Sequence, residues 1–297
     1  MDFDRILCPI DFSDVSGHAL QHAVALAKWY DAEITALHVV HVPLLPQPPI
    51  LTAFADTRET ALSNHEAAED MLRTWLEPAR QAGVKTRVTV DKGNPAAQIL
   101  QNAISSRTDL ITMGTHGLSG FDRLLLGSVT EKVLRKASCP VLTVPPTAVA
   151  TGQLPYKRLL CPVDFSASSI AALNIAFSLA KEADANLTLL HAFEWPGDDE
   201  PLTQRFDVKA YSHTVEDDVR GRLRTLITDD VQVWCKPSTK FAHGKPYRAI
   251  LETARAEATD LIVIGVRGRN PLDLTLFGST TNQVVRQATC PVLTLKQ

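Results

Sequence analysis

Short apolar runs alternate with longer segments of helical periodicity along this chain. In the first half, the runs predict strands over residues 5–10, 33–40, 85–91, 110–113 and 141–144. The periodic segments between them predict helices over residues 13–30, 58–81, from Asn94 onward and over 128–136. Ser13 and Asn94 are suitable helix N-caps, and Gly83 stands where a helix C-cap is expected. Such alternation predicts an α/β fold, with a parallel sheet and helices on both of its faces.

The second half repeats this order because the chain is duplicated. The segment 5–13 (RILCPIDFS) returns as 158–166 (RLLCPVDFS), and 139–143 (CPVLT) returns as 290–294. The shift between the copies is nearly the same at both ends of the repeat. We therefore predict two domains, residues 1–146 and 156–297, joined by a linker over residues 147–155. Each is long enough to bury a core of its own.

A glycine-rich spacing follows the fourth predicted strand of each repeat. Gly114-x-x-Gly117 is followed after nine residues by Gly127-Ser128, and the same spacing recurs from Gly265 to Ser279. A strand, a glycine-rich turn and a helix start together make a phosphate cradle, because glycines let backbone N–H groups approach an anion and the helix dipole attracts it. Asp11, which follows the first strand, would lie at the same edge of the sheet. The spacing predicts a duplicated nucleotide-binding domain.

These motifs resemble the ATP-binding branch of the universal stress protein family, in its tandem two-domain form. The resemblance lies in PID at 9–11 and in MGTHG at 113–117 with LGSVT at 126–130, and it covers nearly the whole chain. It implies two Rossmann-like domains, each with a five-stranded parallel sheet in the order 3-2-1-4-5 and helices on both faces. It also implies antiparallel pairing of the two fifth strands, which makes an intramolecular pseudo-dimer. A further homodimer is an open possibility.

The resemblance also implies a set of nucleotide-binding residues in each repeat. In the first repeat they are Asp11, Val39, Met113, Gly114, His116, Gly117, Gly127, Ser128, Val129 and Thr130. In the second they are Asp164, Ala192, Gly265, Arg267, Gly268, Gly278, Ser279, Thr280 and Thr281. Asp11 and the backbone of Val39 would face the adenosine, and the glycines and hydroxyls would face the phosphates. Because Arg267 and Ala192 depart from the pattern, we expect weaker binding in the second repeat.

Each of these assignments has an alternative. Asp11 could instead cap the helix that follows it. The glycines could form a tight turn that holds no ligand. His116 could be a solvent-exposed loop residue. The proline-rich segment 43–54 and the acidic segment 195–201 differ between the repeats, and both read as surface loops.

Composition and charge narrow the classes of function. The chain is 45% apolar and 21% charged, with a net charge of −3, which is typical of a globular protein with no electrostatic reason to bind nucleic acid. It has no apolar run of about 20 residues, so we expect no membrane-spanning helix. Because the N-terminus is acidic, we do not expect it to be a secretory signal. Four of the five cysteines precede proline at equivalent repeat positions, without metal-ligand spacing, and fit buried thiols in a reducing cytoplasm.

We expect an ATP-binding stress-response regulator or sensor, whose bound nucleotide sets its conformation or its choice of a protein partner that the sequence does not identify. One alternative is a slow ATPase or a nucleotidyl-transfer enzyme, and another is a module that binds no nucleotide. The sequence has no Walker A lysine motif and no acidic pair for catalytic magnesium, so we assign no catalytic residue and no protein metal ligand. Any Mg²⁺ would be held through the phosphates. His116 is the one side chain that could orient a water.

Overall fold

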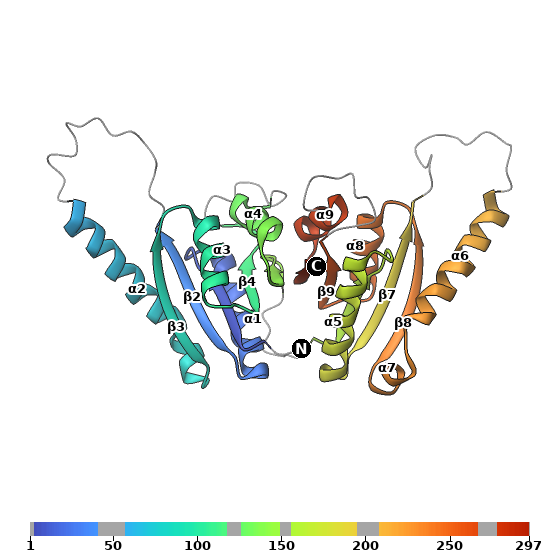
Figure 1. The fold of residues 1–297 in the computed structure, drawn as a ribbon, viewed down its shortest axis with the longest axis horizontal. Helices are drawn as coiled ribbons and strands as arrows, with labels where there is room; N and C mark the ends of the chain where they lie inside the picture. The colour runs from blue at the N-terminus through green and yellow to red at the C-terminus, as the bar shows by residue number, and fades with distance from the viewer. Residues whose placement is uncertain are drawn as a thin grey trace, which may run out of the picture. The chain divides into compact units, whose positions relative to one another are not determined.

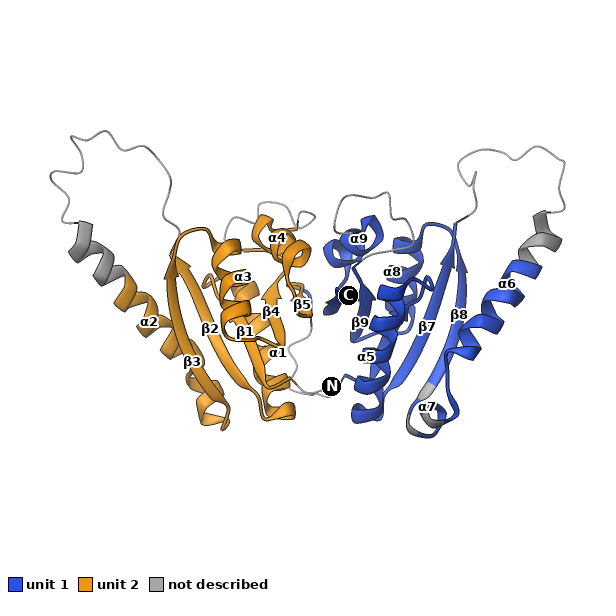
Figure 2. Ribbon diagram, viewed as in Figure 1, with its two compact units in different colours: residues 1, 147–149, 155–297 blue, residues 2–146, 150–154 orange. Residues whose placement is uncertain are grey.

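A computed structural model gives the fold and describes residues 3–40, 57–117, 126–148, 156–194, 208–266 and 278–296. The chain forms two compact units, largely residues 2–146 and largely residues 155–297 (Figure 2). Each unit therefore holds one copy of the repeat. The predicted domain borders and linker stay a prediction, because residues 149–155 lie outside the described ranges.

The first unit alternates strands and helices, as the hydrophobic pattern predicts (Figure 1). Its elements are β1 (Arg5–Pro9), α1 (Asp14–Tyr30), β2 (Glu33–Val40), α2 (Thr57–Gln81), β3 (Lys85–Lys92), α3 (Pro95–Ser105), β4 (Leu110–Gly114), α4 (Ser128–Lys136) and β5 (Val141–Val144). Every strand pair within the unit is parallel, and the strand order is β3-β2-β1-β4-β5. Since the order reverses between β1 and β4, the carboxyl ends of these two strands flank the place where ligands bind in such sheets.

The second unit has the same topology with one addition. Its elements are β6 (Arg158–Pro162), α5 (Ala167–Ala183), β7 (Asn186–Phe193), α6 (Val208–Thr225), α7 (Asp229–Trp234), β8 (Lys236–His243), α8 (Pro246–Ala256), β9 (Leu261–Gly265), α9 (Ser279–Gln287) and β10 (Val292–Leu295). The strand order β8-β7-β6-β9-β10 matches that of the first unit. The short helix α7 is a correction to the expected exact repetition: α6 ends at Thr225, whereas the equivalent α2 continues to Gln81 and ends at the left-handed Gly83.

Helices cover both faces of each sheet, which confirms the predicted fold class. In the first unit α1 and α2 lie together, since a Cβ added to Gly17 would be 3.6 Å from the Trp75 ring, while α3 packs against α4. All five residues of β4 are buried, as expected for a parallel strand covered on both sides. Within the described ranges, none of the helices has both the length and the apolar character needed to cross a bilayer.

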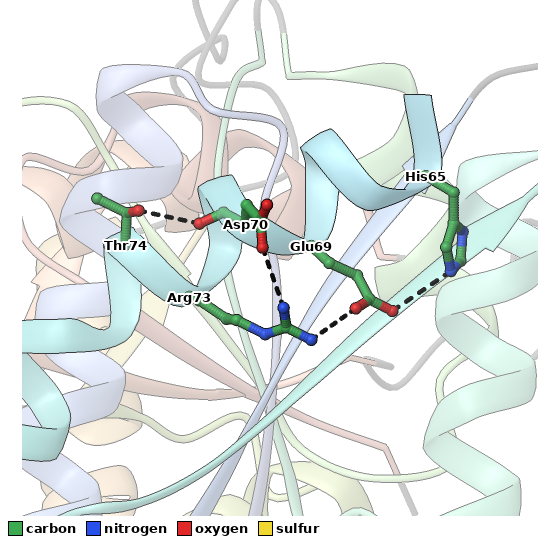
Figure 3. Close-up of polar contacts among 5 residues, drawn as sticks. All are labelled: His65, Glu69, Asp70, Arg73 and Thr74. Atoms are coloured by element: carbon green, nitrogen blue, oxygen red, sulfur yellow. Dashed lines mark hydrogen bonds and ion pairs between the residues drawn. The ribbon is translucent and has the colours of Figure 1, made fainter. Parts of the chain in front are cut away.

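The predicted caps are present at the helix ends. The Ser13 hydroxyl accepts a hydrogen bond from the Ser16 N–H at 3.2 Å, and the Asn94 side-chain oxygen accepts one from the Ala97 N–H at 3.1 Å. The outer surface of α2 carries polar contacts (Figure 3), in which Glu69 lies 3.3 Å from the His65 ring and forms an ion pair with Arg73 at 2.7 Å. Partly exposed contacts of this kind contribute little to stability, so this surface is a suitable place for control substitutions.

Candidate functional site

Asp11 lies in the turn between β1 and α1, at the carboxyl edge of the sheet. Its Oδ1 accepts hydrogen bonds from the Ser13 N–H at 3.1 Å and from the Ser13 hydroxyl at 2.5 Å. Between them, Phe12 has φ +63°, a left-handed conformation that is unusual for a bulky residue. One carboxylate oxygen of Asp11 therefore holds Ser13, the N-cap residue of α1. The alternative that Asp11 helps to cap the helix is thus part of its role.

The other carboxylate oxygen of Asp11 faces the glycine-rich turn after β4. A Cβ added to Gly117 would lie 2.5 Å from Asp11 Oδ2, closer than real side-chain contacts allow. Residue 117 must therefore be a glycine if the carboxylate is to stay where it is. The fold thus brings together the two motif residues that the sequence places after β1 and after β4.

Gly114, the first glycine of the motif, is required by packing. A Cβ at this position would be 2.7 Å from Cγ1 of Val15, in the first turn of α1. The equivalent Gly265 has the same constraint, with the Ser168 backbone 2.7 Å from an added Cβ. These two glycines allow the helix to approach the end of the strand, a reason that the sequence pattern did not reveal.

Helix α4 starts at the same edge without a side-chain cap. Its N-cap is Gly127, which makes no side-chain cap hydrogen bond, and the Ser128 side chain that follows is exposed. The Gly127 N–H donates to the Thr115 carbonyl at 2.9 Å, which fixes the turn against the end of β4. An uncapped helix start favours an anion, because its backbone N–H groups and its dipole both attract negative charge.

The hydroxyl of Thr130 makes a hydrogen bond within the fold. It donates to the Gly114 carbonyl at 2.9 Å, and the side chain is buried. In this arrangement the single hydroxyl hydrogen of Thr130 ties α4 to β4, and the contact of Thr130 with a phosphate stays a prediction. In the second unit, Thr281 donates to Gly265 in the same way at 2.8 Å.

The remaining predicted residues of the first unit surround this edge. The ring of His116 is half-buried, and its Nδ1 lies 2.8 Å from the Thr115 hydroxyl. Met113 is buried in β4. Val39 is half-buried at the end of β2, and Val129 is half-buried in the first turn of α4. These positions agree with a site at the edge, while the contacts of these residues with a nucleotide stay a prediction.

The described part of the second unit repeats the geometry. Asp164 Oδ1 accepts from the Ser166 N–H at 2.9 Å and from the Ser166 hydroxyl at 2.5 Å, and Phe165 also has φ +63°. Helix α9 starts at Gly278 without a side-chain cap, and Ser279 is exposed. The other predicted residues in the described ranges are Ala192 at the end of β7 and Thr280 in α9, both half-buried. Arg267 and Gly268 lie outside the described residues.

Two histidines next to the turns were missed by the sequence analysis. His38 of β2 has its Nδ1 2.8 Å from the carbonyl oxygen of Ile10, and His191 of β7 has its Nδ1 2.6 Å from that of Val163. Each carbonyl belongs to the residue just before the aspartate. The signal in the sequence is the Leu-His pair that recurs at equivalent positions, 37–38 and 190–191.

The cysteines take no part in this site. All five are free thiols, and burial raises the pKa of Cys8 to about 12 and that of Cys139 to about 11. Thiols with such high pKa values are poor nucleophiles at neutral pH. In the parts of the chain that the structure describes, no three histidine, cysteine or acidic side chains gather in a group that could hold a metal ion.

Comparison with known proteins places the chain among proteins of the same architecture. Its sequence is 38% identical to the universal stress protein MJ0531 of Methanocaldococcus jannaschii, over 48% of this chain and 82% of that protein. It is 26% identical to a universal stress protein of Mycolicibacterium smegmatis, over 98% of this chain and 96% of that one. Its fold is similar to the crystal structure of a universal stress protein from Archaeoglobus fulgidus, with a TM-score of 0.72 and 24% identity, over 100% of this chain and 99% of that one.

The family assignment rests on both repeats. The model of the universal stress protein family matches residues 2–145 and again residues 155–296. The two matches together span nearly the whole chain and coincide with the two copies of the repeat. They confirm the resemblance seen in the motifs: this chain belongs to the universal stress protein family and carries two tandem domains of it.

Proposed function

We propose that the first repeat binds ATP at the carboxyl edge of its sheet and that the protein is a nucleotide-dependent stress-response regulator. The observation that carries this proposal is the position of the Asp11 carboxylate, which lies 2.5 Å from where a Cβ on Gly117 would be, beside the uncapped start of α4. The carboxylate accepts hydrogen bonds, as the ribose hydroxyls and the adenine amino group require. The helix start attracts anions, as a phosphate chain requires. The two features match the two ends of a nucleotide.

The second repeat binds the same nucleotide more weakly in this proposal. Asp164 and the uncapped Gly278 keep the two features on which the first site rests. Ala192, which stands where the first repeat has Val39, offers less apolar surface to an adenosine. Arg267 stands where the first repeat has His116 and is a second departure from the pattern of the first site.

A regulator fits the site better than an enzyme. In this proposal the Oδ2 oxygen of Asp11 accepts hydrogen bonds from the adenosine, which keeps it away from the phosphates where a catalytic base would be needed. Mg²⁺, when it accompanies the ATP, would be held by the phosphates and by waters. We also propose that the two repeats form a pseudo-dimer through β5 and β10, and that the protein acts in the cytoplasm on an unidentified protein partner.

The ligand can be identified directly. The purified protein is denatured, and the released small molecules are identified by mass spectrometry; we expect ATP or ADP.

Calorimetry on the protein without bound nucleotide then compares the affinities for ATP, ADP, AMP and cAMP. We expect ATP to bind best, because the anion site beside Gly127 needs the phosphate chain. An affinity for AMP or cAMP equal to that for ATP would contradict the assigned phosphate cradle, and no binding of any nucleotide would overturn the proposed function.

A further inference from the structure

The turn that carries Asp11 is held by a side chain of the neighbouring strand. In the parallel ladder, the Ile10 N–H donates to the Leu37 carbonyl at 2.8 Å. The next residue, His38, then contacts the Ile10 carbonyl through Nδ1 at 2.8 Å. Leu37 and His38 therefore bond the N–H and the carbonyl of Ile10, the residue that precedes Asp11.

The same imidazole also packs against the residue that follows Asp11. The rings of His38 and Phe12 have centroids 4.7 Å apart and are tilted by 37°. Trp75 of α2 meets the Phe12 ring edge-on, with centroids 5.5 Å apart. Phe12 has a left-handed backbone, which is unusual for a bulky residue, and these ring contacts help to hold that conformation.

The second repeat preserves the contacts of the histidine, but another residue takes the place of Trp75 against the phenylalanine ring. The Val163 N–H donates to the Leu190 carbonyl at 2.8 Å, and His191 Nδ1 lies 2.6 Å from the Val163 carbonyl. The rings of Phe165 and His191 have centroids 5.2 Å apart. The guanidinium of Arg222, from α6, lies 3.9 Å above the Phe165 ring in place of an edge-on indole. The histidine is thus the part of the arrangement that both turns share.

We propose that His38 is the positioning residue for Asp11, and that His191 has the same role for Asp164. A carbonyl oxygen only accepts, so Nδ1 must carry a hydrogen and donate it to Ile10. This bond fixes the start of the turn, whereas the ring of Phe12 is packed by Trp75 as well as by His38. The bond thereby directs one oxygen of Asp11 at Ser13 and the other at Gly117. The inference rests on the proposed function only for the identity of the ligand.

The test separates the donor of His38 from its ring. His38→Phe keeps an aromatic ring beside Phe12 and removes the donor, whereas His38→Asn keeps an amide donor near the place of Nδ1 and removes the ring. His65→Phe, at a half-buried position of α2 beside Glu69 (Figure 3), is the matched control. Each variant is titrated with ATP and with inorganic triphosphate, which meets the helix start but has no adenosine for Asp11 to contact.

We expect His38→Phe to weaken ATP binding by about tenfold, the loss of one hydrogen bond, and to leave triphosphate binding within about twofold. His38→Asn and the control should keep ATP binding within about threefold. Unchanged ATP binding by a folded His38→Phe would overturn the inference, and so would an equal loss for ATP and triphosphate, which indicates general damage. If His38→Phe does not fold, His38→Asn decides: retained ATP binding supports the donor role, and loss contradicts it.

A second measurement needs no nucleotide. The Ser13 N–H donates to Asp11 Oδ1, so its amide hydrogen exchange reports how firmly the carboxylate is held. Exchange should be faster in His38→Phe than in wild type and close to wild type in His38→Asn. If the wild-type chain binds no ATP, the proposed function fails, while this exchange measurement still decides the role of His38. Identical exchange in all variants would refute that role.

Discussion

Cγ1 of Val15 lies directly over the backbone of Gly114, so close that a Cβ on the glycine would be 2.7 Å away. The contact joins the first turn of α1 to the carboxyl end of β4. It fixes the distance between the two turns from which the candidate site is built. The packing of the fold therefore requires a glycine at position 114, whether or not a ligand is bound.

Replacement of Gly114 by alanine should destabilise the fold. The overpacked Cβ should lower the free energy of unfolding by about 1–3 kcal/mol, measured by urea denaturation. Gly221→Ala is the control, because its added Cβ meets nothing within 4 Å and alanine is the better helix former in α6. If Gly114→Ala is as stable as wild type, the close packing against Val15 is not as described.

Replacement of Gly117 by alanine should affect the ligand more than the fold. The added Cβ would displace Asp11 Oδ2 from its place, and a lost hydrogen bond to a charged group weakens binding by about tenfold or more. We expect this loss in calorimetric titrations with ATP. A Gly117→Ala protein that binds ATP as tightly as wild type would show that the Asp11 carboxylate does not contact the nucleotide.

Replacement of Gly127 by valine should abolish ATP binding in the first repeat, because the branched side chain fills the approach to the start of α4. Its Cβ alone would lie 3.3 Å from the Thr115 carbonyl, so the turn must also shift slightly. Gly278→Val is the matched change in the second repeat and should leave the tighter site intact. Binding stoichiometry from calorimetry distinguishes the two, and a Gly127→Val protein that is folded and retains the tighter site would refute the assignment.

ATP turnover should be absent or far below the roughly 10 s⁻¹ median of ordinary enzymes. The reason is that the phosphate cradle has no evident nucleophile, and that His116 is the one side chain that could act as a base. The Nδ1 atom of His116 lies next to the Thr115 hydroxyl. Release of ADP is measured in wild type and in His116→Ala. Turnover at enzyme-like rates that disappears in His116→Ala, with ATP binding retained, would make the protein an ATPase.

Acid should destabilise the protein through His22. Burial, together with the neighbouring His18, lowers the pKa of His22 from 6.5 to about 4. The unfolded chain therefore binds this proton more readily, so the contribution to stability is complete above about pH 6.5 and is lost as the pH falls toward 4. The loss has an upper bound of about 3 kcal/mol.

Urea denaturation at pH 7 and at pH 5 measures this effect. His22→Leu should reduce the difference between the two values, because leucine cannot bind the proton. An equal pH dependence in wild type and in His22→Leu would show that another group carries it.

The sequence by itself determined the duplication, the order of elements apart from α7, and most of their ends. These depend on local properties: the apolar period separates strands from helices, and Ser13 and Asn94 cap helices through bonds to residues three positions along the chain. The position of Asp11 at the carboxyl edge also followed, because the alternation of strands and helices makes the sheet parallel. Recurrence of each block in the second repeat made these predictions more secure than one copy would allow.

Only the tertiary structure decided which contacts the motif residues make. Gly117 must be small because of an oxygen of Asp11, and Gly114 because of a methyl group of Val15; both partners are about a hundred residues away in the chain. The Thr130 hydroxyl donates a hydrogen bond to the carbonyl of Gly114, and His38 donates one to the carbonyl of Ile10. Such contacts depend on distances between elements, which side-chain packing sets and local sequence patterns do not encode.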